Sequence, residues 1–302
     1  MRVTILTPTL DAERYFPECL ASLSRQTYPR DRIQHLVLDG GSADRTVSLA
    51  RQAGAEVSVA RDGSLYEAMN RGVALATGEV VGWLNADDTF KPDAVERAVE
   101  AFEAHPRAEI AVGDYEMAFP GRTLVVRVRA DALSRIRAGK ASGTWVTPLA
   151  VFFRTETLRG LGPYRTDLRV ASDLDLWIRA AARTPPPEVV HTGGVAGTFR
   201  EHEDSLSSGT KRERSIREAL EIAGRWRLDE RAPPGVRRHA LALVRQNEFV
   251  LSAWQAREGS SGARLRACMR EVWRLGPRAL WDIREQLRYE VDAIRSQRRA
   301  EP

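Results

Sequence analysis

Residues 80–88 read VVGWLNADD, an apolar run that ends in an amide and two adjacent carboxylates. The apolar run predicts a buried strand over residues 80–85. Adjacent carboxylates at a strand end repel each other and are costly to crowd unless a cation or a water-filled site compensates. The stretch therefore predicts a strand that leads into a polar site. In the alternative interpretation, Asp87 and Asp88 cap the helix expected to begin near residues 91–92.

The first half of the chain alternates apolar runs of this kind with helical patterns. The runs cover residues 3–7, 35–39, 56–60 and 80–85, and the helical patterns cover residues 19–26, 45–53, 65–76 and 92–104. Strands that alternate with helices predict an α/β fold with a Rossmann-like, doubly wound and mainly parallel sheet. Ligands bind beyond the carboxyl ends of such strands. Asp39, Asp62 and the 85–88 segment all follow a predicted strand and are the candidate site residues of this half.

The second half departs from this alternation. Two extended runs over 110–117 and 123–130 flank Pro120-Gly121 and predict a hairpin. An apolar run (149–153), a helix (173–182) and extended segments near 189–191 and 195–200 follow. Beyond Ser205 the sequence is helical and rich in arginine. We expect one α/β domain over residues 1–206 and a helical C-terminal extension over residues 207–302.

Composition bounds the class of protein. The 302 residues are 43% hydrophobic, enough for a sizeable core. Cys19 and Cys268 lie far apart and form no CxxC pair, which fits a reducing compartment. The apolar start is too short for a signal peptide, and no window approaches the roughly 20 apolar residues of a membrane-spanning helix. We expect a cytoplasmic protein, or one at the periphery of the inner face of the cytoplasmic membrane.

The positive charge of the chain belongs to its tail. Residues 211–302 carry 21 Lys and Arg against 13 Asp and Glu, whereas the first 210 residues carry 25 against 28. A basic tail can attract anionic lipid, nucleic acid or a phosphorylated acceptor, and a solvated charged helix surface is the alternative. Nucleic acid is the weaker expectation because the helical spacing of the tail aromatics indicates packing.

An apolar stripe in the tail, Leu265, Met269, Trp273 and Leu280, is flanked by arginines. This arrangement is compatible with peripheral attachment to an anionic membrane. Docking on the first domain, or on a second copy in a homodimer, explains the same stripe.

Four segments carry side chains suited to chemistry. In 38–46 (LDGGSADRT), Asp39 projects from a strand end and can accept from a base N–H or ribose hydroxyls; a capped turn is the alternative. In 85–88, the carboxylates can hold Mg²⁺ or Mn²⁺ together with substrate phosphates. In 171–179 (ASDLDLWIR), Asp173 at a helix start can accept a proton, although Ser172 as a cap explains that segment alone better.

The fourth segment is 199–202, FREH. A neutral His202 can bind a metal or a phosphate, and Arg200 can balance the charge of a diphosphate. A structural histidine is the alternative.

The order of these segments resembles family 2 glycosyltransferases of the GT-A fold, inverting enzymes that build bacterial polysaccharides and other cell-envelope glycans. The resemblance runs from Val3 to about Ser207 and rests on five matches. These are residues 7–9 (TPT), 39–46 (DGGSADRT), 62–72 (DGSLYEAMNRG), 76–88 (ATGEVVGWLNADD) and 162–179 (GPYRTDLRVASDLDLWIR). Asn85 stands where the family's Asp-x-Asp motif has its first aspartate, and Ser172 stands where many relatives have glutamate.

The resemblance implies a role for each matching position. It implies that a metal ion, Mn²⁺ or Mg²⁺, is held by Asp87 with His202, and that Asp173 is the general base. Arg200 stays a candidate for binding the diphosphate because of its own charge. The nucleotide-sugar donor, usually a uridine diphosphate (UDP) sugar, is expected beside Thr7, Thr9, Asp39, Asp62, Asn70, Arg71, Asn85, Ala86 and Asp87. The acceptor is expected to be a saccharide or a lipid-linked molecule.

Two other classes of function stay open at this point. A sugar-1-phosphate nucleotidyltransferase shares a related core, but it needs a Gly-rich basic loop after the first strand, where this chain has TPTLD (7–11). A non-catalytic module that binds membrane or nucleic acid through the basic tail is the second alternative.

Overall fold

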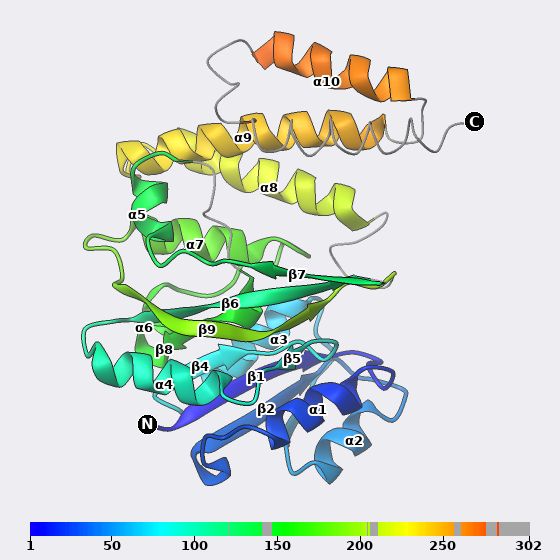
Figure 1. Ribbon diagram of the computed structural model, residues 1–302, viewed down its shortest axis with the longest axis vertical. Helices are drawn as coiled ribbons and strands as arrows, with labels where there is room; N and C mark the ends of the chain where they lie inside the picture. The colour runs from blue at the N-terminus through cyan, green and yellow to red at the C-terminus, as the bar shows by residue number, and fades with distance from the viewer. Residues whose placement is uncertain are drawn as a thin grey trace. The chain divides into compact units, whose positions relative to one another are not determined.

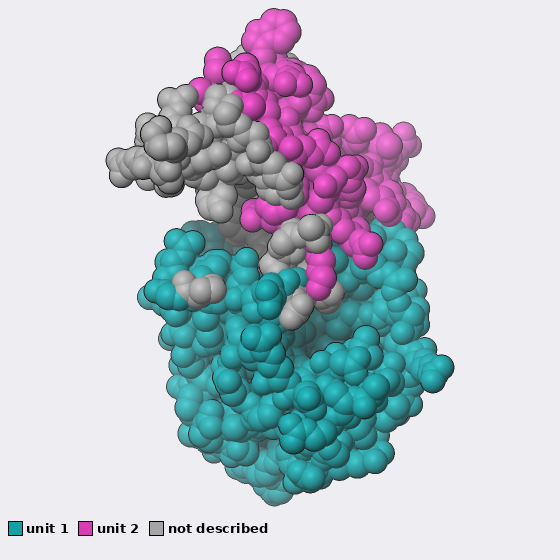
Figure 2. Space-filling view, turned by 90° about the vertical axis from the view of Figure 1, so that its right-hand side faces the viewer, with its two compact units in different colours: residues 1–133, 145–205 teal, residues 134–144, 206–302 magenta. Residues whose placement is uncertain are grey.

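The structure, a computed structural model, describes residues 1–119, 121–140, 147–203, 205, 211–256, 261–275 and 283. The chain forms two compact units, coloured separately in Figure 2. The first comprises Met1–Leu133 and Trp145–Ser205, and the second Ser134–Thr144 and Leu206–Pro302. Residues 134–144 thus belong to the same unit as the C-terminal helices, whereas the sequence predicts a single boundary after residue 206.

The first unit is built on a sheet of nine strands among the described residues, in the order β3-β2-β1-β4-β8-β6-β9-β5 with β7 paired to β6 (Figure 1). The first four of these strands are parallel, which confirms the expected mainly parallel α/β architecture. They are β1 (Val3–Thr9), β2 (Ile33–Asp39), β3 (Glu56–Val59) and β4 (Val80–Trp83). The intervening helices are α1 (Phe16–Ser24), η1 (Arg30–Arg32), α2 (Thr46–Gln52), α3 (Leu65–Leu75) and, after β4, α4 (Ala94–Ala104).

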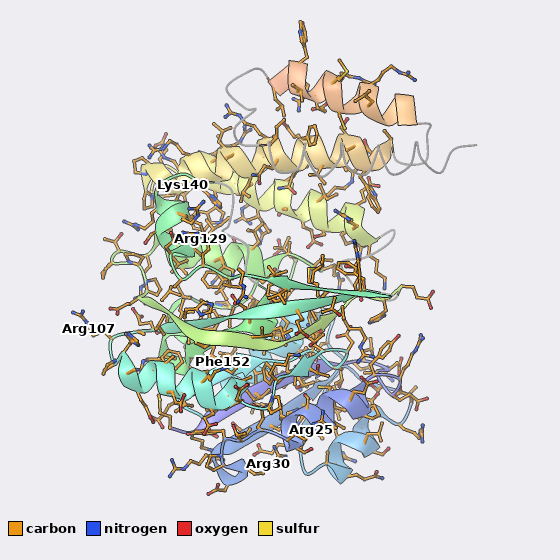
Figure 3. The ribbon with its side chains drawn as sticks, viewed as in Figure 1. Arg25, Arg30, Arg107, Arg129, Lys140 and Phe152 are labelled. Atoms are coloured by element: carbon orange, nitrogen blue, oxygen red, sulfur yellow. The ribbon has the colours of Figure 1, made fainter. Side chains whose placement is uncertain are left out.

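Burial explains why these strands read as continuous apolar runs. Every residue of β1 and β2 is buried, as expected for central strands that are covered on both faces. Helix α3 packs on β1 and β2, and α4 packs on β6 and β9. Phe152, labelled in Figure 3, is fully buried and stacks on Phe90 at 5.7 Å between ring centroids. The sheet thereby gives the site a rigid base.

The other half of the sheet mixes strand directions. Strand β8 is antiparallel to both β4 and β6, β9 is parallel to β6, and β5 is antiparallel to β9. The bounds of this half are β5 (Thr89–Phe90), β6 (Ile110–Phe119), β7 (Arg122–Val126), α5 (Ala132–Arg137), η2 (Pro148–Ala150), β8 (Val151–Arg154), α6 (Thr155–Gly160), α7 (Ser172–Ala182) and β9 (Val189–Arg200).

The predicted hairpin is present as β6 and β7, with Gly121 at a φ of 77° in the turn and Pro120 outside the described residues. The second strand of the hairpin was expected over residues 123–130, but the observed strand, β7, covers only Arg122–Val126. It ends at Val126 because the Val128 N–H donates to the Asp114 carboxylate at 2.9 Å instead of to a neighbouring strand. The two extended segments expected over 189–200 form one strand, β9, whose register against β6 shifts at Asp114.

The described helices of the second unit are α8 (Lys211–Leu228), α9 (Pro234–Gln255) and α10 (Ser261–Leu275). Helix α9 packs on both α8 and α10. Phe249, Ala253, Cys268 and Ile283 form a buried cluster against which Leu265 packs. No helix in the described parts of the chain combines the length and the apolar character needed to cross a membrane.

The apolar stripe expected in the tail does not form one face. Leu265 packs toward the Phe249 cluster, whereas the side chains of Met269 and Trp273 are 63% and 89% exposed. Leu280, its fourth member, lies outside the described residues. The core-facing side of α10 is made by Leu265, Cys268 and Val272, whose spacing of three and four residues matches one side of a helix.

Candidate active site

The carboxyl ends of three strands meet at one edge of the sheet. Strand β1 pairs in parallel with both β2 and β4, so that Thr9 lies beside Asp39, and Leu6 lies beside Trp83. The segments that leave β2 and β4 therefore start close together. This edge is where ligands bind in doubly wound sheets.

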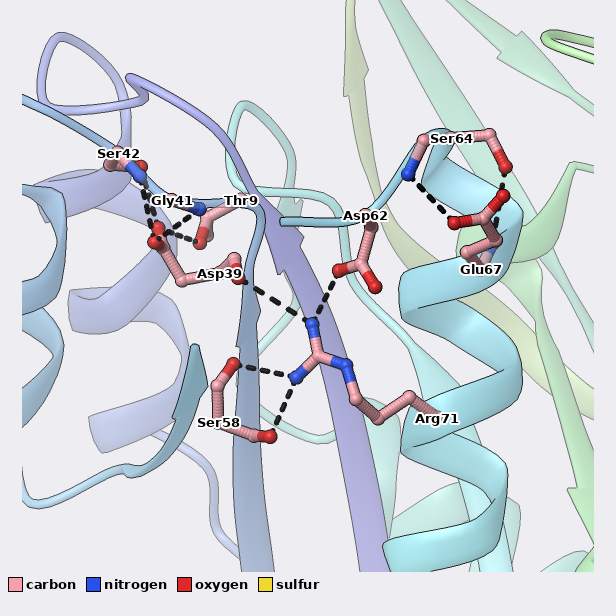
Figure 4. Close-up of polar contacts among 10 residues, drawn as sticks. Thr9, Asp39, Gly41, Ser42, Ser58, Asp62, Ser64, Glu67 and Arg71 are labelled. Atoms are coloured by element: carbon pink, nitrogen blue, oxygen red, sulfur yellow. Dashed lines mark hydrogen bonds and ion pairs between the residues drawn. The ribbon is translucent and has the colours of Figure 1, made fainter. Parts of the chain in front are cut away.

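Asp39 closes the turn after β2. Its carboxylate is fully buried and accepts from the Thr9 hydroxyl (2.9 Å), the backbone N–H groups of Gly41 (2.9 Å) and Ser42 (2.8 Å), and the Ser42 hydroxyl (2.5 Å) (Figure 4). Gly41 has a φ of 97°, which this turn requires and which a side chain disfavours. Asp39 thus shapes the loop, as in the capped-turn interpretation, and its contact with a nucleotide stays a prediction.

Thr7 lies in β1, two residues before Thr9 at this edge. It is fully buried, and its hydroxyl is 3.0 Å from Nε2 of His35. Burial lowers the pKa of His35 to about 3, so the imidazole is neutral. The Thr7–His35 pair therefore supports the edge from beneath in this structure, and the predicted contact of Thr7 with the donor stays a prediction.

Arg71 ties three segments together behind the turn. From α3, its Nη2 atom donates to Asp62 Oδ2 at 2.5 Å, and its Nη1 atom donates to the carbonyl and hydroxyl of Ser58 at 2.7 and 2.6 Å (Figure 4). Its Nη2 atom also lies 3.5 Å from the Asp39 carbonyl. Asp62 and Arg71, both predicted on the donor side, are thus brought together as a partly buried ion pair.

Helix α3 is fixed at its start beside this pair. The Ser64 hydroxyl accepts from the Glu67 N–H at 3.3 Å, and the Glu67 carboxylate accepts from the Gly63 N–H at 2.7 Å (Figure 4). This exchange is a variant of a capping box and holds the loop that carries Asp62.

Asn70, one turn further along α3, is committed to the protein backbone. Its amide donates to the Tyr164 carbonyl at 2.9 Å and accepts from the Tyr164 N–H at 2.8 Å. The Tyr164 ring stacks on Tyr66 and meets Trp83 edge to face, with centroid distances of 5.8 and 5.6 Å. Asn70 therefore holds the Tyr164 backbone, and its predicted contact with the donor stays a prediction. Tyr164 lies in a matched motif, but its contacts with Asn70, Tyr66 and Trp83 join distant segments and could not be predicted from that motif.

The segment after β4 is held by its own amide. Asn85 Oδ1 accepts from the Trp83 indole N–H at 2.7 Å, and Asn85 Nδ2 donates to Asp88 Oδ2 at 2.9 Å. Asp88 Oδ1 in turn accepts from the Arg200 backbone N–H at 2.9 Å. Burial raises the pKa of the Asp88 carboxyl well above its usual range, and the negative charge of Asp87 adds to this effect.

The helix-cap interpretation of this segment is wrong. Helix α4 begins at Ala94, directly after Asp93, and makes no cap with Asp87 or Asp88. Asp88 instead fastens the end of β9 to the segment after β4. The partner of Asp88 is a backbone N–H 112 residues away, which leaves no signal in the sequence.

Asp87 and His202, the two predicted metal ligands, are in direct contact. His202 Nε2 is 3.0 Å from Asp87 Oδ2 although the residues are 115 positions apart, and their side chains are 14% and 33% exposed. The described residues contain no group of three or more His, Cys, Asp or Glu that could hold a metal ion by themselves. A carboxylate oxygen and an imidazole nitrogen fit a divalent cation that takes its other ligands from substrate phosphates and water.

Arg200 lies next to this pair. Its guanidinium forms an ion pair with Glu18 and stacks over the Tyr15 ring at 4.7 Å from the centroid. The side chain is therefore already engaged, and its predicted contact with a diphosphate stays a prediction.

Asp173 lies in the first turn of α7. Its Oδ1 accepts from the Leu174 N–H at 2.9 Å, and the residue lines a cavity of about 20 Å³ together with Trp83, Tyr164 and Trp177. Burial raises the pKa of the Tyr164 hydroxyl, and the negative charge of Asp173 raises it further. Asp173, the predicted base, and Trp83 at the end of β4 thus border one small, largely apolar cavity.

The alternative role of Ser172 as a helix cap is wrong. Its hydroxyl accepts from the Arg165 N–H at 2.7 Å, and α7 has no side-chain cap. Asp175 is engaged by Arg179 at 2.8 Å, and Arg179 also donates to the carbonyl of Gly162 at 3.0 Å. These contacts leave Asp173 as the acidic residue of this turn that faces the cavity.

Comparisons with known proteins agree with this architecture. The model of "Glycosyl transferase family 2" matches residues 4–159. An uncharacterised glycosyltransferase of Mycobacterium tuberculosis is 31% identical over 258 residues, which cover 82% of this chain and 91% of the relative. A PGL/p-HBAD biosynthesis glycosyltransferase of Mycobacterium bovis is 31% identical over 183 residues, covering 58% of this chain and 68% of the relative.

Two solved structures share the fold. Residues 1–349 of Staphylococcus aureus TarS, in complex with UDP-GlcNAc, superpose with a TM-score of 0.65 at 16% identity and cover 96% of this chain and 88% of theirs. The mannosyltransferase PcManGT of Pyrobaculum calidifontis, in complex with GDP-Man and Mn²⁺, gives 0.62 at 21% identity, covering 96% and 86%. The fold is that of a GT-A glycosyltransferase.

The chain belongs to glycosyl transferase family 2. It is therefore a glycosyltransferase, and the nucleotidyltransferase and non-catalytic alternatives fall away as its primary function.

Proposed function

We propose that the chain transfers a sugar from a nucleoside diphosphate sugar to an acceptor hydroxyl, with inversion at the anomeric carbon and with the help of Mn²⁺ or Mg²⁺. The contact between Asp87 and His202 at the carboxyl edge of the parallel strands carries this proposal. The bound molecules of the two structural neighbours, UDP-GlcNAc in TarS and GDP-Man with Mn²⁺ in PcManGT, support a donor of this class. We take a UDP sugar as the first candidate. We assign this chemistry to residues 1–206 and treat 207–302 as an extension.

Asp87 and His202 would hold the cation in this proposal. When bound, it would offset the negative charge that develops on the leaving diphosphate. His202 must be neutral to bind a metal, and its contact with Asp87 orients the ring. The other residues of the segment support this pair, since Asn85 and Asp88 fix the backbone on either side of Asp87.

The donor nucleotide would lie along the same edge of the sheet. We propose that Thr7, Thr9, Asp39, Asp62, Asn70, Arg71, Asn85 and Ala86 shape its pocket. In this structure, most of their polar side-chain groups bond to other protein groups. Their contribution is therefore mainly to fix the loops that would surround the base and ribose.

Asp173 would accept the proton of the acceptor hydroxyl. The carboxylate lies at a helix start, where the partial positive charge of the N-terminus favours the ionised, basic form. Trp83, Tyr164 and Trp177 surround it and limit the access of water. A base on the face of the sugar opposite the leaving diphosphate supports direct displacement, which inverts the anomeric centre.

We further propose that the acceptor is a saccharide or lipid-linked molecule of the cell envelope, used at the inner face of the cytoplasmic membrane. One side of α10 supports attachment to an anionic membrane, because the exposed Met269 and Trp273 alternate with the exposed Arg266 and Arg270. The same side could instead contact a second copy of the chain, and the vesicle experiment described in the Discussion separates the two.

The test of the central proposal uses two variants and two measurements. A panel of nucleotide sugars is first screened for thermal stabilisation with Mn²⁺ present, because a donor that binds only the folded state raises its stability. With the donor identified, Asp87→Ala should abolish Mn²⁺-dependent stabilisation and transfer, whereas Asp173→Asn should abolish transfer and keep stabilisation. Full transfer by both variants would refute the proposed mechanism.

A further inference from the structure

Tyr15, in the loop between β1 and α1, contacts the proposed metal pair. Its ring centroid lies 4.7 Å from that of His202, with the planes inclined by 42°. The guanidinium groups of Arg200 and Arg14 lie over the same ring, at 4.7 and 4.9 Å from its centroid. One half-buried aromatic side chain thus contacts the imidazole and two cations.

The backbone that carries His202 is anchored separately from its side chain. The Arg200 N–H is bound by Asp88 at 2.9 Å, and the His202 N–H donates to the Ser205 hydroxyl at 3.1 Å. These bonds fix the path of the chain, and they involve backbone N–H groups rather than the His202 ring. The tilted contact with Tyr15 restricts rotation of the His202 side chain on one side of the ring, and the contact with Asp87 restricts it at Nε2.

The charges around Tyr15 favour the same arrangement. The electron-rich face of the ring attracts Arg200, whose guanidinium is also held by Glu18. Arg14 places a second guanidinium over the same ring, within 4.0 Å of Glu203. The ring thereby holds the positive charge of Arg200 where it interacts with Asp87.

We propose that Tyr15 is a positioning residue that holds the His202 imidazole against Asp87 and keeps Arg200 beside them, so that the site is preorganised for a divalent cation and a diphosphate. This inference rests on the proposed role of Asp87 and His202 as metal ligands. In the described part of the chain no hydrogen bond to the Tyr15 hydroxyl is present, so the aromatic ring carries the effect. Groups that orient metal ligands typically contribute 10- to 100-fold to metal affinity.

The experiment measures binding of Mn²⁺ with UDP to the full chain by titration calorimetry. Tyr15→Phe keeps the ring and should bind within twofold of the wild type. Tyr15→Leu and Tyr15→Met remove the ring while filling part of its volume, and each should weaken Mn²⁺ binding about tenfold, at the low end of the expected range. His202→Ala gives the full loss expected when the ligand itself is absent. Thermal unfolding of each variant without ligands shows whether the variant is folded. Two variants without the ring are used so that a folding defect of one of them does not decide the result.

The outcomes separate the two proposals. Weak binding by both ring-free variants and by His202→Ala, with normal binding by Tyr15→Phe, supports the positioning role. Wild-type binding by either ring-free variant, with weak binding by His202→Ala, overturns the role of Tyr15 and leaves the metal pair intact. Wild-type binding by His202→Ala, or no binding of Mn²⁺ with UDP by the wild type, overturns the metal pair and the positioning role with it.

Discussion

Replacement of Asn70 by alanine should destabilise the first unit strongly, because both ends of this side chain bond to one backbone residue. The variant loses the 2.9 Å bond to the Tyr164 carbonyl and the 2.8 Å bond from the Tyr164 N–H. Each group left without a partner costs about 1–3 kcal/mol. Since Asn70 is half-buried and water can replace part of the loss, we expect a decrease of roughly 2–4 kcal/mol in the free energy of unfolding.

The assay is thermal and urea unfolding of the full chain, followed by calorimetry and near-ultraviolet circular dichroism. A unit of this size shifts its midpoint by about 2–4 °C per kcal/mol, so the first unit should unfold roughly 5–15 °C earlier. Asn247→Ala is the matched control, because Asn247 makes one local bond, to the Leu243 carbonyl at 2.9 Å in α9. An Asn70→Ala variant with wild-type stability but no donor binding would refute a stabilising role for the two Asn70–Tyr164 bonds and would indicate a direct contact of Asn70 with the donor.

Three further predictions concern other parts of the chain. Burial lowers the pKa of His35 to about 3 in the folded state, so the unfolded chain binds more protons than the folded chain between pH 3 and 6.5. The free energy of unfolding should therefore fall as the pH drops through this window. His35→Gln should flatten that slope by about 1 kcal/mol per pH unit below pH 6, as measured by urea unfolding. Ser172→Ala removes the acceptor for the Arg165 N–H and should cost about 1–2 kcal/mol of stability without shortening α7, because the hydroxyl does not cap that helix. The double variant Met269→Ser, Trp273→Ser should co-sediment less with vesicles of phosphatidylcholine and phosphatidylglycerol, and its binding to vesicles of pure phosphatidylcholine should not change. Unaltered co-sedimentation of the double variant would reject membrane attachment by this surface. Loss of a dimer in analytical ultracentrifugation, in place of a loss of vesicle binding, would reject it as well.

The parallel half of the sheet could be predicted from sequence because its signal is local. Strands β1, β2 and β4 are short buried runs, β3 is a short and partly exposed strand at the end of the sheet, and the helical patterns between these strands indicate a right-handed, parallel arrangement. The antiparallel position of β8 could not be derived in this way. Its apolar residues, 151–153, are buried between β4 and β6 whichever way the strand runs, and the pattern of burial carries no direction.

The same distinction between local and distant signals decides which parts of the candidate site could be predicted from the sequence. The position of Asp39, Asp62 and Asp87 at strand ends follows from the alternation, since parallel strands bring their carboxyl ends to one edge. The pairing of Asp87 with His202 joins residues 115 positions apart in the sequence, and only the resemblance to a family connected them in advance. The roles of Asp88, Asn70 and Ser172 depend on backbone groups of distant loops, which have no side-chain signature in a sequence.

The neighbours of residue 85 explain why an asparagine, rather than an aspartate, is suited to this position. Its oxygen accepts from the Trp83 indole while its nitrogen donates to the buried Asp88 carboxylate. An ionised aspartate at this position could accept from Trp83 but could not donate to Asp88, and it would place a further negative charge beside Asp87. A single amide therefore satisfies a donor and an acceptor at once and leaves Asp87 as the most exposed carboxylate of the segment. In the proposed mechanism, Asp87 is therefore the carboxylate of this segment that would bind the cation, together with the His202 imidazole that it contacts.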